Sequence, residues 1–267
     1  MRPLFLAALL AILPATVGAA PPVGERPGAS VAAAGTEPKR AATMKGLVEP
    51  RLALSSEVGS PVRVALTFDA CSGKTDHRIL SVLVTNRIPA TIFATARWLK
   101  RNPDTAALLK ANPDLFEVEN HGAMHVPAVD RPGTVYGIRA AGSPDAVAAE
   151  VAGGADALEK AGFPAPRWFR GATARYTPTA MEAIGTMGYR VAGYSLNGDD
   201  GASVAAATAE KRLAGARDGA VVIAHINQPD RAAGAGVARG ILALKARGVT
   251  FVRLADAAEE AGGKTGH

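Results

Sequence analysis

Between residues 62 and 254, short apolar runs alternate with longer segments whose apolar residues recur at helical spacing. The apolar runs predict buried strands over residues 62–68, 90–94, 115–119, 167–169, 189–195, 220–224 and 249–254. The periodic segments predict helices over residues 76–86, 104–111, 145–161, 178–187, 204–214 and 232–245. A long loop is expected over residues 125–144.

The predicted strands are apolar along their whole length instead of alternating with polar residues. This pattern is typical of a parallel sheet that is covered on both faces. Repeated strand–helix units in a segment of this length favour a closed or nearly closed barrel over an open sheet. We therefore predict an α/β fold, a (β/α) barrel, formed by one domain over residues 46–267.

The N-terminus has the pattern of a secretory signal peptide over residues 1–20: a basic start, an apolar run over 4–17 and small residues before Pro21. The apolar run is short for a membrane span. We predict cleavage near Ala20, export to the periplasm or the exterior, and no stable membrane span afterwards; a retained anchor is the alternative. Residues 21–45 are rich in Pro, Gly, Ala and charge, which predicts a flexible linker.

Composition narrows the function classes. Hydrophobic residues make up 48% of the 267 residues, which is enough for a substantial core. The net charge is +6, but the basic residues form no arm and no face interleaved with aromatic residues, so a nucleic-acid partner is not expected. The single cysteine, Cys71, excludes an intramolecular disulfide and a zinc knuckle built on cysteines.

Polar residues suited to chemistry lie where predicted strands end: Asp69, His121, His125, Arg170 and His225. The carboxyl ends of barrel strands meet at one rim, where barrel enzymes assemble their active sites. A buried carboxylate or imidazole there needs a partner or a metal to offset the cost of desolvation. We therefore expect these residues to converge on one site.

His121 and His125 are spaced so that both imidazoles lie on one face of a helical turn and share a metal ion. On its own this spacing is weak evidence for a metal site, because two histidines so spaced are usually solvated or cap a helix. It gains weight because the chain has five histidines, and His121, His125 and His225 all fall at the predicted rim.

Four segments occur in a suggestive order: Thr67-Phe68-Asp69, Asn120-His121-Gly122-Ala123-Met124-His125, Phe169-Arg170-Gly171-Ala172 and Ile223-Ala224-His225. With them the chain resembles the polysaccharide deacetylase family (carbohydrate esterase family 4) over about residues 60–256. The resemblance implies a distorted (β/α) barrel and metal-dependent removal of N-acetyl or O-acetyl groups from glycans. By position, Asp69 resembles the catalytic base, His121 and His125 metal ligands, Arg170 the arginine that orients the base, and His225 the general acid.

The chain departs from the family at the third metal ligand. The family usually has a second aspartate where this chain has Ala70. Asp76 is the nearest carboxylate further along, and Gly73 gives the intervening loop freedom to fold back. We predict Asp76 as the third ligand. One alternative is that Asp76 only caps the following helix, and another is that Asp69 itself binds the metal.

Two further motifs depart from the family. The arginine motif, residues 170–176, lacks the usual prolines, and the segment 194–200 has aspartates but no tryptophan. Asp199 is the candidate to tune His225, and the alternative is that it terminates a turn. Cys71 shows no paired base in the sequence, which disfavours a nucleophilic role.

The resemblance implies a hydrolase of an acetylated polysaccharide or oligosaccharide that uses metal-activated water. Zinc is the default for histidine and aspartate ligands, while cobalt, nickel and manganese are compatible with them. One alternative is a metal-free relative that binds glycans without activity, which the loss at Ala70 favours. Another is an amidohydrolase acting on a small non-sugar amide. Measuring the metal content of the protein distinguishes the metal-free relative from the hydrolase. Comparing activity on sugar oligomers with activity on small amides distinguishes the amidohydrolase from the polysaccharide deacetylase.

Overall fold

A parallel sheet forms the centre of the computed structural model, which describes residues 44–55 and 61–257. The predicted signal peptide and residues 21–43 of the predicted linker lie outside the described residues. Strand order is β7-β6-β3-β2-β1-β9-β8, with β10 paired to the start of β1. The strands are β1 (Arg63–Ala70), β2 (Ala90–Ala94), β3 (Phe116–Asn120), β6 (Trp168–Phe169), β7 (Arg190–Val191), β8 (Leu196–Asn197), β9 (Ala220–His225) and β10 (Thr250–Val252).

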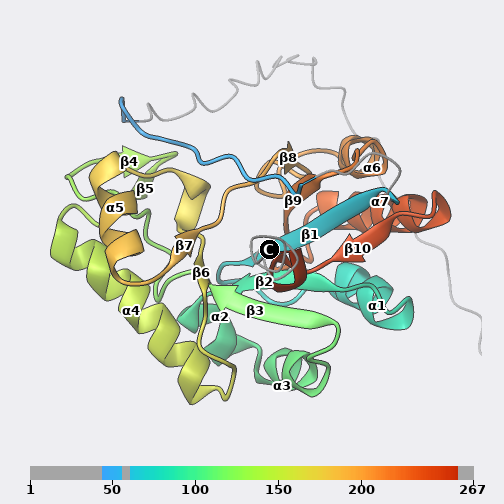
Figure 1. The fold of residues 1–267 in the computed structure, drawn as a ribbon, viewed down its shortest axis with the longest axis horizontal. Coiled ribbons are helices and arrows are strands. Elements are labelled where there is room, and N and C mark those ends of the chain that lie inside the picture. Colours follow the sequence, from blue (N-terminus) through green and yellow to red (C-terminus); the bar gives the residue numbers. More distant parts are fainter. Residues whose placement is uncertain (1–43, 56–60, 258–267) are drawn as a thin grey trace, which may run out of the picture. The chain divides into compact units, whose positions relative to one another are not determined.

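The sheet is a curled, incomplete barrel. Its end strands are β7 and β8, and the order given above does not join them to each other (Figure 1). The neighbouring strands pair in parallel throughout the sheet. The predicted distorted (β/α) barrel is therefore confirmed.

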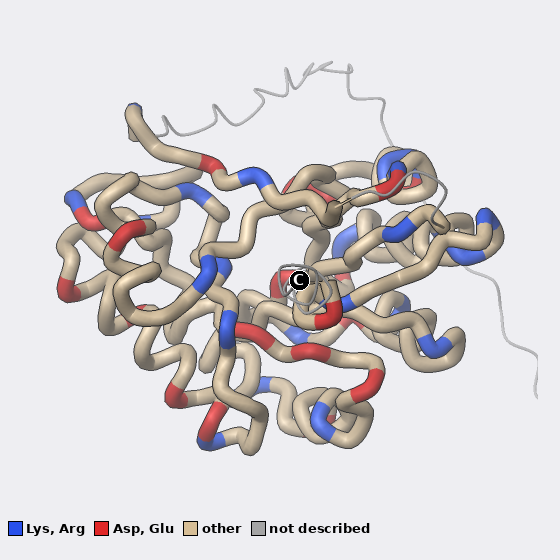
Figure 2. The backbone as a smooth tube through the Cα atoms, in the orientation of Figure 1, with Lys and Arg blue, Asp and Glu red and all other residues tan. Residues whose placement is uncertain are grey.

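The helices lie around this sheet (Figure 1). They are α1 (His77–Thr85), α2 (Ala96–Arg101), α3 (Pro103–Ala111), α4 (Pro144–Lys160), α5 (Pro178–Thr186), α6 (Ala206–Ala214) and α7 (Ala233–Ala246). Among the described residues, no helix combines the length and hydropathy that crossing a membrane requires. Basic and acidic residues are interspersed along the described backbone (Figure 2).

Strand β1 separates two layers of the core. Leu66, Phe68 and Ala70 belong to the large apolar cluster that includes residues of α1, α6 and α7. Ala65 belongs to a second cluster, on the inner side of the curled sheet. Because side chains alternate along a strand, Asp69 also faces inward. The register of β1 thus decides which of its residues can reach the site.

Three details differ from the sequence prediction. The strand predicted over 189–195 is only β7, followed by a loop and then β8. In that loop, a Cβ on Gly193 would lie 2.2 Å from the Pro50 carbonyl oxygen, so glycine admits a close backbone approach. Helix α2 was not predicted; Thr95 caps it by accepting from the Trp98 N–H. The predicted loop 125–144 contains a hairpin of β4 (Thr134–Val135) and β5 (Ile138–Arg139).

Residues 44–55 form a segment that we call the strap. Its Val48 exchanges backbone hydrogen bonds with Tyr176, which follows β6. Further along, the Leu52 N–H donates to the Tyr194 carbonyl and the Leu54 N–H to the Gly219 carbonyl, just before β9. The strap therefore connects loops at one end of the sheet with the start of β9 (Figure 1).

Candidate active site

A cavity of about 600 Å³ opens at the carboxyl ends of the strands. Asp69, Cys71, His125 and His225 line it together with polar and aromatic residues of the surrounding loops. Its volume lies in the range typical of small-molecule sites. Three of the five residues predicted at the rim, Asp69, His125 and His225, therefore line one cavity. The other two, Arg170 and His121, are buried beside Asp69, at 3.0 and 3.8 Å from its carboxylate oxygens.

Asp69 and Arg170 form a buried ion pair. Arg170 Nη1 donates to Asp69 Oδ1 at 3.0 Å and to Thr67 Oγ1 at 2.7 Å, and Nη2 donates to the Gly193 carbonyl at 2.9 Å. Burial raises the pKa of the Asp69 carboxyl, but the charges of His121 and Arg170 outweigh burial and hold it below its usual value. Asp69 is therefore ionised and fixed in orientation.

His225, the last residue of β9, is held by Asp199. Its backbone N–H donates to Asp199 Oδ2 at 2.7 Å, and its ring Nδ1 lies 2.9 Å from Asp199 Oδ1. Burial lowers the pKa of His225, yet the Asp199 carboxylate outweighs burial and raises it well above its usual value. Because Nδ1 faces Asp199, Nε2 is the nitrogen available for chemistry. The structure thus brings together the pair predicted from the sequence.

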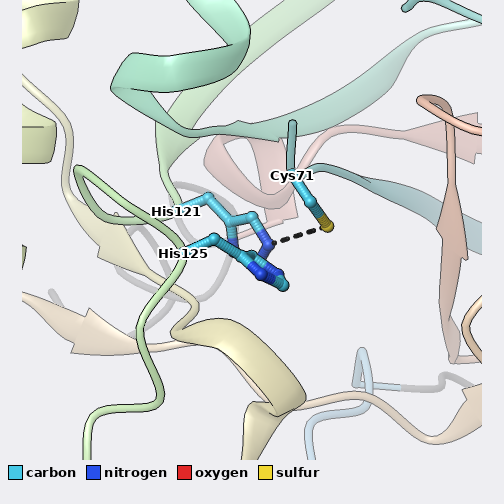
Figure 3. Close-up of side chains that lie close together, drawn as sticks. All are labelled: Cys71, His121 and His125. Carbon is cyan, nitrogen blue, oxygen red and sulfur yellow. Dashed lines mark hydrogen bonds between the residues drawn. The ribbon is translucent and has the colours of Figure 1, made fainter. Parts of the chain in front are cut away.

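A third group consists of Cys71, His121 and His125 (Figure 3). One ligand atom from each lies within 4.8 Å of the others. His121 Nε2 is 3.5 Å from Cys71 Sγ, and the two imidazole centroids are 5.1 Å apart. His121 Nδ1 donates a hydrogen bond to the Arg170 carbonyl, because a carbonyl oxygen can only accept, and Nε2 faces the Cys71 sulfur.

The predicted helical turn around the histidines is wrong. Residues 121–125 form a loop in which Gly122 and His125 have φ of +86° and +62°. The Glu150 carboxylate on α4 holds this loop by accepting from the Met124 and Val126 N–H groups at 3.0 Å. The histidines therefore meet through loop geometry and not through helical periodicity.

Asp76 lies elsewhere and is the N-cap of α1. Its Oδ1 accepts from the Arg78 N–H at 3.1 Å, and both carboxylate oxygens contact the Arg78 guanidinium at 2.8 and 2.6 Å. Among the described residues, it is not part of the cluster of ligand atoms around His121 and His125. The structure thus contradicts the predicted position and gives the alternative, a helix cap, because Arg78 engages the carboxylate.

Cys71 occupies the place beside the histidines that the sequence analysis assigned to a carboxylate. The signal that points to it is the alternation of side chains at the end of β1. Asp69 and Cys71 are two residues apart, so they face the same side, whereas Ala70 faces the helix-covered core. The family pattern points to a carboxylate near Ala70, whereas the alternation of side chains points to the Cys71 sulfur on the side of Asp69.

A second unforeseen feature is a wall of the cavity built around Glu49 of the strap. Glu49 Oε2 lies 2.6 Å from Arg175 Nη2, and Glu49 Oε1 accepts from the Tyr194 hydroxyl. Arg175 Nε donates to the Tyr136 hydroxyl at 2.6 Å. These residues come from four separate segments, which are far apart in the sequence, so sequence spacing gave no sign of their meeting.

Comparison with solved structures shows the same fold in several deacetylases. The peptidoglycan deacetylase PdaC from Bacillus subtilis, in a mutant form, is 20% identical, with a TM-score of 0.62 over 77% of this chain and 94% of that chain. A family 4 acetyl xylan esterase from Clostridium thermocellum, in complex with cobalt, is 24% identical, with a TM-score of 0.60 over 75% of this chain and 92% of that chain. A CE4 family pseudoenzyme from Bacillus anthracis is 20% identical, with a TM-score of 0.57 over 74% and 65% of the two chains.

No curated protein matches the chain by sequence. The family model described as polysaccharide deacetylase matches residues 57–192, about half of the chain. The matched range includes Asp69, Cys71, His121, His125 and Arg170, and it ends before Asp199 and His225. The match confirms the family and the enzyme class expected from the sequence: the chain belongs to the polysaccharide deacetylase family.

Proposed function

We propose that this protein is a metal-dependent hydrolase that removes acetyl groups from an N-acetylated or O-acetylated polysaccharide or oligosaccharide. The observation that carries the proposal is the convergence of three groups on one cavity. These are the Asp69–Arg170 pair, the His225–Asp199 pair and the cluster of Cys71 with two histidines.

The donor atoms fit the divalent metal that the family implies. Two imidazoles and a sulfur lie within 4.8 Å of one another, a donor set suited to zinc or cobalt. His121 also has the outer hydrogen bond typical of a metal-bound histidine, from Nδ1 to a backbone carbonyl. His121, His125 and Cys71 would hold the metal, which when bound lowers the pKa of a water molecule and polarises the acyl oxygen.

Asp69 and His225 divide the proton transfers between them. Asp69 is ionised and oriented by Arg170, so it accepts the proton of the attacking water. His225 is held protonated by Asp199, so it donates a proton to the departing amine nitrogen. An amide substrate needs that donor because the nitrogen would otherwise have to leave as an amide anion. The same donor can protonate the sugar oxygen that leaves from an O-acetyl group.

A glycan is the substrate class that the cavity and the comparisons support. The cavity lining combines polar and apolar residues, and the wall around Glu49 presents hydroxyl, carboxylate and guanidinium groups suited to sugar hydroxyls. Two of the similar structures bear the names of a peptidoglycan deacetylase and an acetyl xylan esterase. Export is part of the proposal and rests on the signal-peptide pattern of residues 1–20. A measured mass of the native protein that corresponds to a chain starting near Pro21 would support export. A cytoplasmic form that retains Met1 would contradict it.

The experiment is acetate release by zinc-loaded protein from N-acetylglucosamine oligomers and from small acetylated amides. We expect release from the oligomers, with Asp69→Asn and His225→Ala each lowering kcat about 10²–10⁴-fold while zinc remains bound. Release from the small amides alone would favour the amidohydrolase alternative. Oligomer binding without any release would favour the inactive relative, of which the Bacillus anthracis pseudoenzyme is a structural example.

A further inference from the structure

The cluster around the histidines contains sulfur where the family resemblance led us to expect a carboxylate. We infer that Cys71 is the third protein ligand of the metal, bound as a thiolate, and that its sulfur makes the site select zinc or cobalt over manganese and magnesium. This inference rests on the proposed metal-dependent function, and it assigns to Cys71 a role that the sequence resemblance does not supply.

The end of β1 delivers the sulfur to the site. Cys71 directly follows the strand, lines the cavity and is 7% exposed, while its Sγ lies 3.5 Å from His121 Nε2. In Figure 3 the sulfur points toward the two imidazole rings. Ala70, the position where the family has its second aspartate, is fully buried in the helix-covered core. A ligand one residue further on therefore reaches the site without any change in the register of β1.

The loop after β1 is held in place, so a carboxylate from further along the chain has little freedom to return. The Thr95 hydroxyl donates to the Cys71 carbonyl, and the Thr95 N–H donates to the Ala70 carbonyl at 3.2 Å. A Cβ on Gly73 would lie 2.1 Å from the Asn227 carbonyl oxygen. Glycine at position 73 thus permits a close backbone contact with Asn227. It does not give the loop the freedom that the sequence led us to expect.

The remaining polar groups of the site are already engaged. Asp69 is paired with Arg170 through Oδ1, His225 with Asp199, and Asp76 with Arg78. Asp69 Oδ2 lies 3.8 Å from His121 Nε2. Among the described residues, the cluster of metal-binding atoms has a sulfur and two imidazole nitrogens and no carboxylate oxygen. Thiolates prefer zinc and cobalt, whereas manganese and magnesium prefer oxygen ligands. The donor set therefore predicts the metal preference.

The test is a cobalt titration of the metal-free protein, followed by absorption spectroscopy. Because Cys71 is the only cysteine, a thiolate-to-cobalt charge-transfer band can arise from this residue alone. The variants are Cys71→Ser, Cys71→Asp and the control Asp76→Asn, which changes the carboxylate first predicted as the ligand. A second readout is the reactivity of the single thiol toward an alkylating reagent, with and without zinc or manganese.

We expect the charge-transfer band in the unmodified protein and in Asp76→Asn, and its loss in Cys71→Ser. Zinc should protect the thiol and manganese should not. Loss of a metal ligand should lower zinc affinity by more than the about 10–100-fold typical of residues that only support a ligand. Cys71→Asp should narrow the affinity difference between zinc and manganese, because it replaces sulfur by oxygen.

Three outcomes would overturn the inference. The first is cobalt binding that gives no charge-transfer band and that His121→Ala abolishes. It would show a metal site without the thiolate and would leave the proposed function standing. An acetyl group trapped on the sulfur as a thioester would make Cys71 a nucleophile. A protein that binds neither cobalt nor zinc would remove the inference and the proposed function together.

Discussion

His225 Nδ1 lies 2.9 Å from Asp199 Oδ1, and the same carboxylate accepts the His225 backbone N–H at 2.7 Å. One aspartate therefore fixes both the position and the ring orientation of the imidazole. Asp199→Asn should keep the fold but lower kcat about 10–100-fold with little change in KM, because it weakens the proton donor and not substrate contact. Steady-state kinetics at several pH values checks this. An unchanged kcat would show that His225 does not depend on Asp199.

Helix α4 shapes the loop of the histidines through Gly154. A Cβ at this position would lie 2.1 Å from Asn120 Oδ1 and 2.8 Å from Gly122 Cα. Gly154→Ala should therefore displace the loop, weaken zinc binding and lower the melting temperature. The matched control is Gly185→Ala on α5, since nothing lies within 4 Å of its Cβ. That change should be neutral or stabilise the fold by about 0.5–1 kcal/mol. Equal effects of the two changes would contradict this interpretation.

Asp76 contributes to stability rather than to metal binding. It caps α1 and pairs with Arg78, so Asp76→Ala should lower the free energy of unfolding by about 1–2 kcal/mol. Zinc stoichiometry should stay the same, whereas His121→Ala should lose the zinc. Thermal unfolding and metal analysis on both variants check the prediction. Loss of zinc in Asp76→Ala would return the carboxylate to the metal site.

Glu119 on β3 is buried and interacts with the side chain of Glu117, two residues earlier on the same strand. Burial, together with the Glu117 charge, raises the pKa of Glu119 to about 8 against the lowering effect of the Trp168 N–H. Between about pH 5 and pH 8 the folded protein therefore holds a proton that the unfolded chain has released, so stability falls as pH rises. The slope contributed by one such proton is at most about 1.4 kcal/mol per pH unit.

Glu119→Gln should remove this part of the pH dependence. Melting temperatures of the two proteins should differ more at pH 8 than at pH 5, with the variant relatively more stable at pH 8. Comparing the two proteins at each pH isolates Glu119 from the histidines that also titrate in this range. Parallel curves across the whole range would contradict the assignment.

Hydrophobic patterning predicted most of the fold because its apolar strands are buried on both faces. Strand β2 (Ala90–Ala94) has the predicted bounds, and helices such as α5 differ only at an end. The hairpin of β4 and β5 and the short helix α2 were missed, because they depend on local turns and on tertiary packing rather than on a repeated pattern.

The sequence predicted the site residues that lie at the ends of strands. It did not predict the contacts between residues that are far apart in the sequence. Asp69 and His225 lie at the ends of paired strands, and the structure brings them to the same cavity. The strap carries Glu49 to Arg175, more than a hundred residues further along the chain, and no sequence spacing encodes that contact. Strand alternation places Cys71 on the same side as Asp69, whereas the family pattern predicts a carboxylate as the ligand.

The most direct test of the account is acetate release from an N-acetylglucosamine oligomer by one preparation that is stripped of metal and then reloaded with zinc. The account predicts release by the protein as purified, none after stripping, and recovery when about one equivalent of zinc is restored. Undiminished release by the stripped protein, or a fully loaded protein that releases no acetate, would contradict it.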